Sequence, residues 1–488
     1  MSLSILIWLP LAVGLVAAVL PRSIGPRVAA LGTLVVLGLS IYLLVDFDGG
    51  GGMQYVTDET WISELGIHYK LGVDGLNLFL IALTALGFAA TAIASNFREL
   101  ERPNLYFFHV LLAETAVLGA FVAQDLALFV VFFDLMLIPF FFLTGQWGSG
   151  DRVAATIKMV IYTLVGSLLM LAAAVATGVL AAGDGQSLSF ALSDLQERTL
   201  GEGTQDWIFL LFAAAFLVKM PAFPLHGWMP DGYRAMPIEA LATFSGVVSK
   251  VAAYGFLRIV LPVFPDAAAE FQDLLLVIAL ASILYGSVMA FTTTHARLIA
   301  GYSSVAQLGF ITLGIFALND QGAQGALLQM VNHGLVTIPL FLIIAVLARR
   351  AGGSEDIRDM GGIAFRAPVL ASLFLVVALA TLAMPGSSNF VGEFMILLGV
   401  FESKIVIACI AFTGVALAAV YMLRAFIRMM HNRVGPKVES RELALSDALV
   451  LVPLVAVILF FAVYPQLALE RSESSVVTAV QPAQEVAK

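Results

Sequence analysis

Residues 216–250 read FLVKMPAFPLHGWMPDGYRAMPIEALATFSGVVSK, and they place two lysines inside apolar runs long enough to cross a bilayer. Lys219 lies twelve residues beyond Trp207, which puts it roughly 18 Å into a hydrocarbon core about 30 Å thick. A lysine stem of about 6 Å cannot easily return that charge to water. Lys250 lies near the middle of the next apolar run, residues 238–262. Both lysines are therefore predicted at mid-depth in a membrane.

Two prolines follow Lys219 within five residues. Pro221 and Pro224 each remove a backbone donor, so the helix is predicted to break near the depth of Lys219. Pro385, followed by GSSN, predicts a similar break in a later apolar run. Unwound backbone in a membrane must line protein or water. Charges beside such breaks predict an ion path.

The composition excludes a soluble domain. Apolar residues make up 60% of the 488 residues, charged residues 12%, and the mean hydropathy is +0.97. The runs are continuously apolar over about 18–25 residues, which is typical of helices and not of membrane barrels. The single cysteine, Cys409, excludes an intrachain disulfide and a cysteine-ligated iron–sulfur cluster. We expect no cofactor and no metal on this chain, and the net charge of −9 without a basic run gives no nucleic-acid signal.

The apolar runs predict an all-α polytopic membrane protein with about fourteen spans. They start near residues 2, 27, 74, 105, 124, 155, 207, 238, 271, 297, 324, 367, 404 and 444. The two breaks are five spans apart, and this odd offset reverses the direction of crossing. Spans four to eight and nine to thirteen are therefore expected to be inverted repeats, a layout typical of transporters. The predicted parts are residues 1–103 (three helices and an external loop), 104–262 and 263–430 (the repeats), and 431–488 (the last helix and a short polar tail).

Lysines and arginines are distributed unequally between the two predicted faces of the membrane protein. The odd-numbered loops and their helix ends carry seventeen of them: Arg22, Arg27, Arg98, Arg102, Arg152, Lys158, Arg234, Arg297, Arg349, Arg350, Arg358, Arg366, Arg424, Arg428, Arg433, Lys437 and Arg441. The other face carries six: Lys70, Arg198, Arg258, Lys404, Arg471 and Lys488. The positive-inside rule then places the odd loops in the cytoplasm and both termini outside.

Five ionisable residues at mid-depth are the main candidates for proton transfer. They are Asp134, Lys219, Lys250, His333 and Glu393. Asp134 is the ionisable residue at mid-depth in its span, and a pair with Lys219 would keep both groups able to exchange protons. A fixed ion pair is the alternative for Asp134, and a neutral packing role is the alternative for His333. We expect the five to form a polar axis in the membrane plane.

Three further residues are secondary candidates. Glu114 shares the fourth span with His109 and could feed the same axis, or bind a neighbouring hydroxyl. Lys158 is better explained as a lysine that reaches the cytoplasmic surface. His226 follows the break after Lys219, where lining a channel mouth is as reasonable as carrying a proton.

These motifs resemble one family, the antiporter-like membrane subunits of respiratory complex I (NADH:quinone oxidoreductase), and within it the chain M type, the counterpart of NADH dehydrogenase subunit 4. The resemblance covers nearly the whole chain. It rests on FVAQDLALFVVFFDLMLIP, VKMPAFPLHGWMPD, SKVAAYGFLR, YSSVAQLGF, the HGL after Asn332, and MPGSSNFVGEFMIL. The family fold has fourteen helices with two inverted five-helix repeats.

The resemblance implies roles for the five candidates. Asp134 and Lys219 would form the charge pair of a first half-channel, Lys250 the central lysine, His333 a relay and Glu393 the terminal group toward the exit. Sister chains L and N, and multisubunit cation/proton antiporters, usually have a lysine where Glu393 stands.

Four positions depart from the family pattern. Asp134 replaces a glutamate, Gln307 and Tyr233 each replace a histidine, and Glu239 stands in a changed APT segment.

The resemblance predicts a proton-translocating subunit of a bacterial inner-membrane NADH:quinone oxidoreductase, a translocase that carries out no redox chemistry itself. Flavin, iron–sulfur clusters and quinone are expected on partner subunits, and chains L and N are expected on either side of it in the lipid bilayer. Two alternatives remain open: a subunit of a stand-alone cation/proton antiporter, and a scaffold whose channels no longer conduct. Five buried ionisable groups argue against the scaffold, because each costs free energy in lipid.

Overall fold

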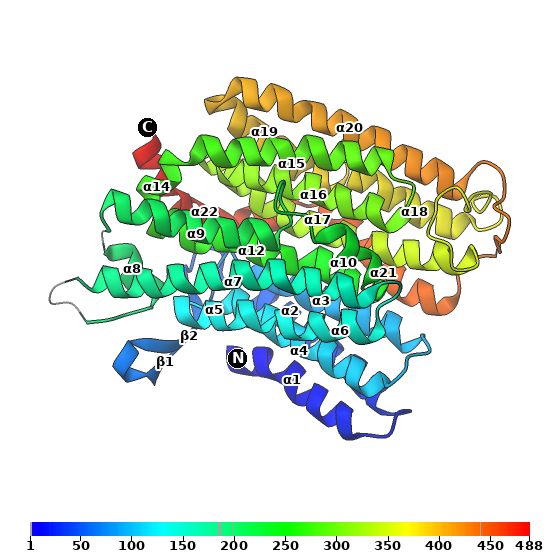
Figure 1. The fold of residues 1–488 in the computed structure, drawn as a ribbon, viewed down its shortest axis with the longest axis horizontal. Helices are drawn as coiled ribbons and strands as arrows, with labels where there is room; N and C mark the ends of the chain where they lie inside the picture. Colours follow the sequence, from blue (N-terminus) through cyan, green and yellow to red (C-terminus); the bar gives the residue numbers. More distant parts are fainter. Residues whose placement is uncertain (1, 184–186, 199, 440) are drawn as a thin grey trace.

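The computed structural model describes residues 2–183, 187–198, 200–439 and 441–488, and helices dominate it (Figure 1). The first helices are α1 (Leu3–Val19), α2 (Gly25–Asp46), α3 (Leu78–Asn96), α4 (Pro103–Val122), α5 (Leu126–Leu135), α6 (Leu137–Trp147) and α7 (Arg152–Ala182). The middle segments are α8 (Leu192–Glu197), α9 (Glu202–Lys219), α10 (Met229–Ala235), α11 (Ile238–Thr243), η2 (Phe244–Val248), α12 (Ser249–Gly255), η3 (Phe256–Val260), α13 (Leu261–Val263) and α14 (Pro265–Glu270). The last are α15 (Gln272–Thr292), α16 (Ala296–Ile315), α17 (Asp320–Arg350), α18 (Pro368–Thr381), α19 (Ser388–Ser403), α20 (Ile405–Met430), α21 (Leu445–Val463) and α22 (Gln466–Ala487).

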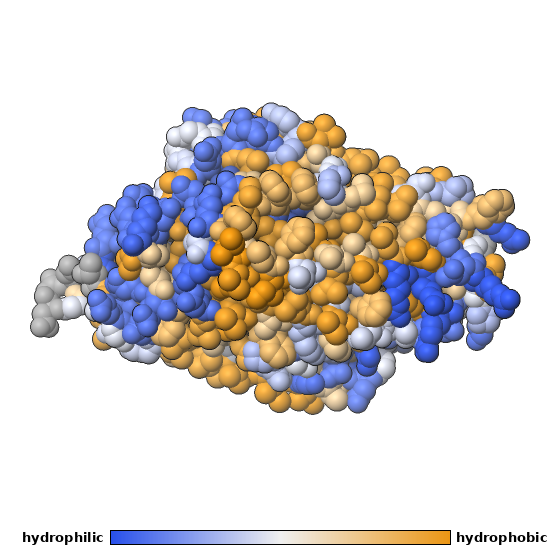
Figure 2. Space-filling view, turned by 90° about the horizontal axis from the view of Figure 1, so that it is seen from above, coloured by the Kyte–Doolittle hydropathy of each residue, from blue (hydrophilic) through white to orange (hydrophobic). Residues whose placement is uncertain are grey.

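The helices run alongside one another, and the surface between their ends is apolar. Within the described residues, eleven segments are long and apolar enough to cross a membrane, and α1 and α18 are shorter apolar helices. Figure 2 shows hydrophilic residues gathered at the two ends of the long axis, with a mostly apolar surface between them. Helices α16 and α17 are buried at the centre, whereas α7 exposes apolar side chains such as Ile161 and Leu168. This pattern confirms an all-α polytopic membrane protein.

Three finer predictions are not tested by these observations. The count of fourteen spans, the two inverted repeats and the boundaries 1–103, 104–262, 263–430 and 431–488 stay predictions.

Both predicted breaks are present. Helix α9 ends at Lys219, and α10 begins only at Met229. Helix α18 ends at Thr381 and α19 begins at Ser388, with Gly386 between them at a φ of 89° that suits glycine. The prolines thus interrupt the helices where the sequence predicts.

A small hairpin was not predicted in the external loop that we expected within residues 1–103. Strand β1 (Gln54–Ile62) pairs antiparallel with β2 (Ile67–Val73), joined by the short helical turn η1 (Ser63–Leu65). Thr57 pairs with Leu71 and Thr60 with His68. Threonine and aromatic residues favour such strands, but the acidic residues and nearby glycines hid the pattern.

The expected short polar tail after the last span is wrong, because residues 466–487 form helix α22. Its buried residues recur every three or four positions and face the core: Ala468, Ser472, Val476, Ala479, Val480 and Ala483. It packs against α13, α14 and α17. Low hydropathy along the whole segment concealed this narrow apolar stripe.

Candidate functional site

The end of α9 places Lys219 inside the protein. Only 4% of this residue is exposed, and its Nζ lies 4.8 Å from the centre of the Phe133 ring. The broken backbone beyond it is satisfied locally: Trp228 Nε1 donates to Val218 O (3.0 Å) and Phe223 N to Ser282 Oγ (3.0 Å). The break is therefore a packed part of the core, as unwound backbone in a membrane must be.

Asp134 stands at the end of α5, next to the ring that Lys219 covers. Its side chain is half-buried, and its Oδ1 atom is buried without a protein hydrogen-bond partner in the described structure. Within the described residues, no direct ion pair joins Asp134 to Lys219. Asp134 and Lys219 therefore do not form the expected charge pair by direct contact.

Lys250 is fully buried just after a π-helical segment. Its Nζ donates to Ser245 O (2.8 Å) and to Ser249 Oγ (3.3 Å). The π-helical segment η2 contains Ser245, and π-turns inside helices occur frequently at functional sites. The lysine therefore has neutral oxygen partners and no carboxylate partner among the described residues.

His333 lies on α17, which packs against α12. The histidine is 2% exposed, and its Nδ1 has no hydrogen-bond partner in the described structure. The structure thus places His333 and Lys250 on helices that pack together, and within the described residues no hydrogen bond joins them.

Glu393 is buried on α19 within a network of amides. Its Oε1 accepts from Gln307 Nε2 at 2.6 Å and from Gln329 Nε2 at 3.4 Å, while Gln329 Nε2 also donates to Gln307 Oε1 at 2.8 Å. Gly392 permits this approach, because a Cβ there would lie 2.6 Å from Gln329 Oε1. Glu393 Oε2 is buried and has no hydrogen-bond partner in the described chain. Gln307, where the resemblance predicts a histidine, thus hydrogen-bonds the Glu393 carboxylate.

The three secondary candidates differ in burial and in the groups they contact. Glu114 is fully buried, and neither of its carboxyl oxygens has a hydrogen-bond partner among the described residues. His226 lies between aromatic rings, 4.7 Å from Tyr285 and 5.7 Å from Phe223. Lys158 pairs with Asp231 at 2.8 Å, with both side chains more than two-fifths exposed. Lys158 is therefore a surface group, as expected.

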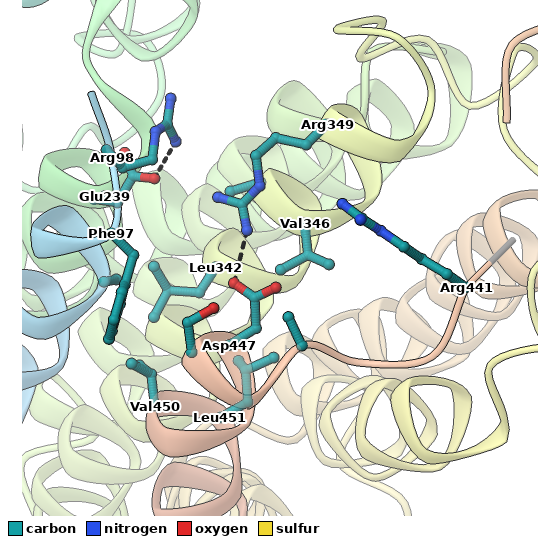
Figure 3. Close-up of a pocket in the computed structure, with 14 residues that line it drawn as sticks. Phe97, Arg98, Glu239, Leu342, Val346, Arg349, Arg441, Asp447, Val450 and Leu451 are labelled. Atoms are coloured by element: carbon teal, nitrogen blue, oxygen red, sulfur yellow. Dashed lines mark hydrogen bonds and ion pairs between the residues drawn. The ribbon is translucent and has the colours of Figure 1, made fainter. Parts of the chain in front are cut away.

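Two ion pairs with buried carboxylates were not recognised from the sequence. Glu239 pairs with Arg98 (Figure 3), and Asp74 pairs with Arg258, whose Nε also donates to Tyr254 OH at 2.9 Å. For the Glu239–Arg98 pair, the sequence offered one indication: Glu239 is a carboxylate without an evident partner at the start of an apolar run. The partners lie far apart in the sequence, so the pairing itself could not be predicted.

Tyr233, another departure from the family pattern, is buried among aromatic rings. Its ring centroid lies 6.2 Å from each of Trp228, Phe244 and Phe341, and its carbonyl accepts from Arg297 at 3.0 Å. A packing role therefore accounts for the aromatic side chain at this position.

Sequence comparisons with known proteins match membrane subunits of one family. The family described as NADH:quinone oxidoreductase/Mrp antiporter, TM, matches residues 123–433. NADH-quinone oxidoreductase subunit M of Rhodobacter capsulatus is 38% identical over 98% of this chain and 96% of its own length. The subunit M of Escherichia coli is 35% identical over 92% of each chain.

Solved structures agree with the sequence comparison. A chain in respiratory complex I from Thermus thermophilus with bound NADH aligns with a TM-score of 0.91 and 31% identity, covering 99% of both chains. A chain of the Mrp complex from Dietzia sp. aligns with a TM-score of 0.85 at 21% identity, covering 99% of this chain and 98% of that one, which shows a shared fold.

Proposed function

This chain belongs to the family of membrane subunits that NADH:quinone oxidoreductases and Mrp antiporters share, and we propose that it moves protons along its buried ionisable residues. It is a proton-translocating membrane-arm subunit of NADH:quinone oxidoreductase. The proposal concerns how this chain performs that function, and with which partners.

The observation that carries the proposal is the burial of charged groups beside broken or π-helical segments. Lys219 ends α9 at the break, Lys250 follows η2, and Glu393 follows the break before α19. Each would cost free energy in lipid unless it had partners or a function. We place these residues in one route with Asp134 at its start and His333 between Lys250 and Glu393.

Proton movement along this route needs groups that change protonation state in turn. Lys219 faces an aromatic ring and not a carboxylate, and Lys250 has hydroxyl and carbonyl partners, so neither is locked in a direct ion pair. The orphan Oε2 of Glu393 offers a final acceptor. Water between these groups would complete the connection.

The chain itself is proposed to act as a translocase without redox chemistry. Electron transfer through flavin, iron–sulfur clusters and quinone would take place on partner subunits and drive the proton steps here. We propose chains of the L and N type as its neighbours in the membrane arm, and a bacterial inner membrane, with both termini on the outer face, as its location.

A subunit of a stand-alone cation/proton antiporter is the second candidate. The fold shared with the Mrp complex favours it, and sodium or potassium would then use the same polar axis. Glu393 argues for the oxidoreductase, because lysine is usual at this position in the antiporters. Copurification in mild detergent decides between them: hydrophilic flavin and iron–sulfur subunits are expected with the chain, and their absence would favour the antiporter.

Lys219→Met tests the proton route directly. Methionine fills a similar volume without the charge, so we expect the complex to assemble and to lose most of its proton pumping. The measurement is proton uptake by inverted membrane vesicles per NADH oxidised. Lys404→Met is the matched control, because Lys404 pairs with Asp273 at the surface. Full pumping by assembled Lys219→Met would reject the route.

A further inference from the structure

Three helices that pack together bring two amide side chains to the carboxyl group of Glu393. Glu393 lies on α19, Gln307 on α16 and Gln329 on α17, and none of the three is more than 3% exposed. Their side chains close a triangle of hydrogen bonds, in which each glutamine donates to Glu393 and Gln329 also donates to Gln307. The hydrogen-bond partners of this buried carboxyl group are therefore two neutral amides.

The two oxygens of the Glu393 carboxyl group have different surroundings. Oε1 lies 2.6 Å from Gln307 Nε2 and 3.4 Å from Gln329 Nε2, and it accepts from both. Oε2 is buried and has no hydrogen-bond partner in the part of the chain that the structure describes. Because each carboxylate oxygen has about two acceptor sites, both sites at Oε1 are occupied. A proton would therefore bind at Oε2.

Close packing of α17 against α19 fixes the position of Gln329 relative to Glu393. A Cβ at Gly392 would lie 3.1 Å from Gln329 N, and a Cβ at Gly325 would lie 2.9 Å from Gly392 O. These neighbours are backbone atoms, which cannot move aside as a flexible side chain can. Gln329 in turn orients Gln307, because its Nε2 donates to Gln307 Oε1 at 2.8 Å.

The chemistry of the amides limits what the two glutamines can do. A side-chain amide donates and accepts hydrogen bonds, but unlike a carboxyl group or an imidazole it does not exchange a proton as an acid or a base. Neither glutamine can thus be a step of a proton route. An N–H group that donates to a carboxylate does favour its ionised form, so both glutamines can act on the proton affinity of Glu393.

We propose that Gln307 and Gln329 are positioning residues, which bind Oε1 of Glu393 and leave Oε2 as the one atom that takes up and releases the proton. The proton that binds Oε2 leaves from the same oxygen, and the group returns to the carboxylate. The two N–H donors stabilise that carboxylate, so the group can give its proton away after each uptake. This inference deepens the proposed function and rests on the role of Glu393 in it.

Gln307→Met tests the positioning role in the assembled complex. Methionine fills a similar volume but donates no hydrogen bond, so the protonated form of Glu393 should be favoured. We expect a lower proton yield per NADH in inverted vesicles, because the group then gives up its proton less readily. A hydrophobic carbodiimide, which reacts with protonated carboxyl groups, should label Glu393 up to about tenfold faster, the factor that one hydrogen bond to a charged group can supply.

Mass spectrometry of the peptide that carries Glu393 measures this labelling at one fixed pH. Glu114 is the internal reference, because it is a buried carboxyl group whose oxygens have no hydrogen-bond partner among the described residues. Its labelling rate should not change. Gln324→Met is the matched control: Gln324 is a buried glutamine on α17 that donates to Ser472 Oγ at 2.9 Å, and its loss should change neither readout at Glu393.

Gln307→His separates positioning from packing. A ring N–H can donate to Glu393 in place of the amide, so the proton yield and the labelling rate should stay near those of the parent. A packing role predicts the reverse, because methionine matches the volume of glutamine better than histidine does. Gln329→Met gives a second arm if Gln307→Met does not assemble, since it removes the other donor and the hydrogen bond that orients Gln307.

The outcomes separate the positioning role from the proposed function. Parent-like labelling and proton yield in an assembled Gln307→Met or Gln329→Met variant would reject the positioning role, and so would a Gln307→His variant that behaves like Gln307→Met. An equal change in Gln324→Met would show a general effect of buried amides and would also reject it. Normal proton yield in Glu393→Gln would reject the role of Glu393 itself, whereas a loss there beside a normal Gln307→Met would reject the positioning role alone.

Discussion

Asp134 carries its carboxylate closer to the backbone than the glutamate that the family resemblance predicts, by about 1.5 Å along an extended side chain. In the structure Lys219 lies over the Phe133 ring and makes no direct ion pair with Asp134 within the part of the chain described. The buried Oδ1 of Asp134 lacks a protein partner there. We expect an ordered water to bridge the two groups, which would preserve their electrostatic coupling.

Two substitutions at Asp134 test this coupling. Asp134→Asn should lose pumping, because the amide cannot exchange a proton, and Asp134→Glu should keep most of it, because the longer side chain restores the reach. The measurement is proton uptake by inverted vesicles, normalised to assembled complex. Normal pumping by Asp134→Asn would mean that this residue is structural and that the first half-channel starts elsewhere, with the orphan carboxylate of Glu114 the next to test.

Individual residues of the site could be predicted because they are charged groups within apolar runs of sequence. A charge in an apolar run identified Lys219, Lys250 and Glu393, and the structure finds each of them buried. Their partners could not be predicted. Gln307 reaches Glu393 from 86 positions away and Arg98 reaches Glu239 from 141 positions away, and such contacts depend on how the helices pack.

At the scale of elements, the helix breaks could be predicted because they depend on the covalent structure of proline. Proline removes a donor, so the breaks after α9 and α18 follow from the sequence. The β1–β2 hairpin and α22 depend on tertiary contacts and were missed. Helix α22 is held by hydrogen bonds such as Gln324 Nε2 to Ser472 Oγ at 2.9 Å and Gly75 N to Ser475 Oγ at 3.0 Å.

Val480→Asp tests whether α22 depends on its apolar face. Val480 is fully buried, so an aspartate there places an unpaired charge in the interface, and we expect a loss of stability on the order of 3 kcal/mol or more. Limited proteolysis of the purified complex should then cut within α22. Thr478→Asp is the control, because Thr478 is exposed on the same helix and should leave the cleavage pattern unchanged.

At the scale of the whole molecule, the two ends differ in charge. The basic loops that are separated in sequence meet at one end: Arg297 pairs with Glu355, Arg350 donates to Glu442 O at 3.1 Å, and Asn96 Nδ2 donates to Pro26 O at 2.9 Å. The hairpin, α14 and α22 lie at the other end (Figure 1). A membrane around the apolar surface in Figure 2 would separate these ends.

The positive-inside rule predicts that the end with the basic loops faces the cytoplasm, and cysteine labelling tests this prediction. In a Cys409→Ser background, Gly50→Cys precedes the hairpin and Arg433→Cys lies in the basic loop before α21. An impermeant maleimide should label the first in intact spheroplasts and the second only in inverted vesicles, because the excess of positive charge holds the basic loops inside. Labelling of Gly50→Cys from the cytoplasmic side alone would reverse the orientation.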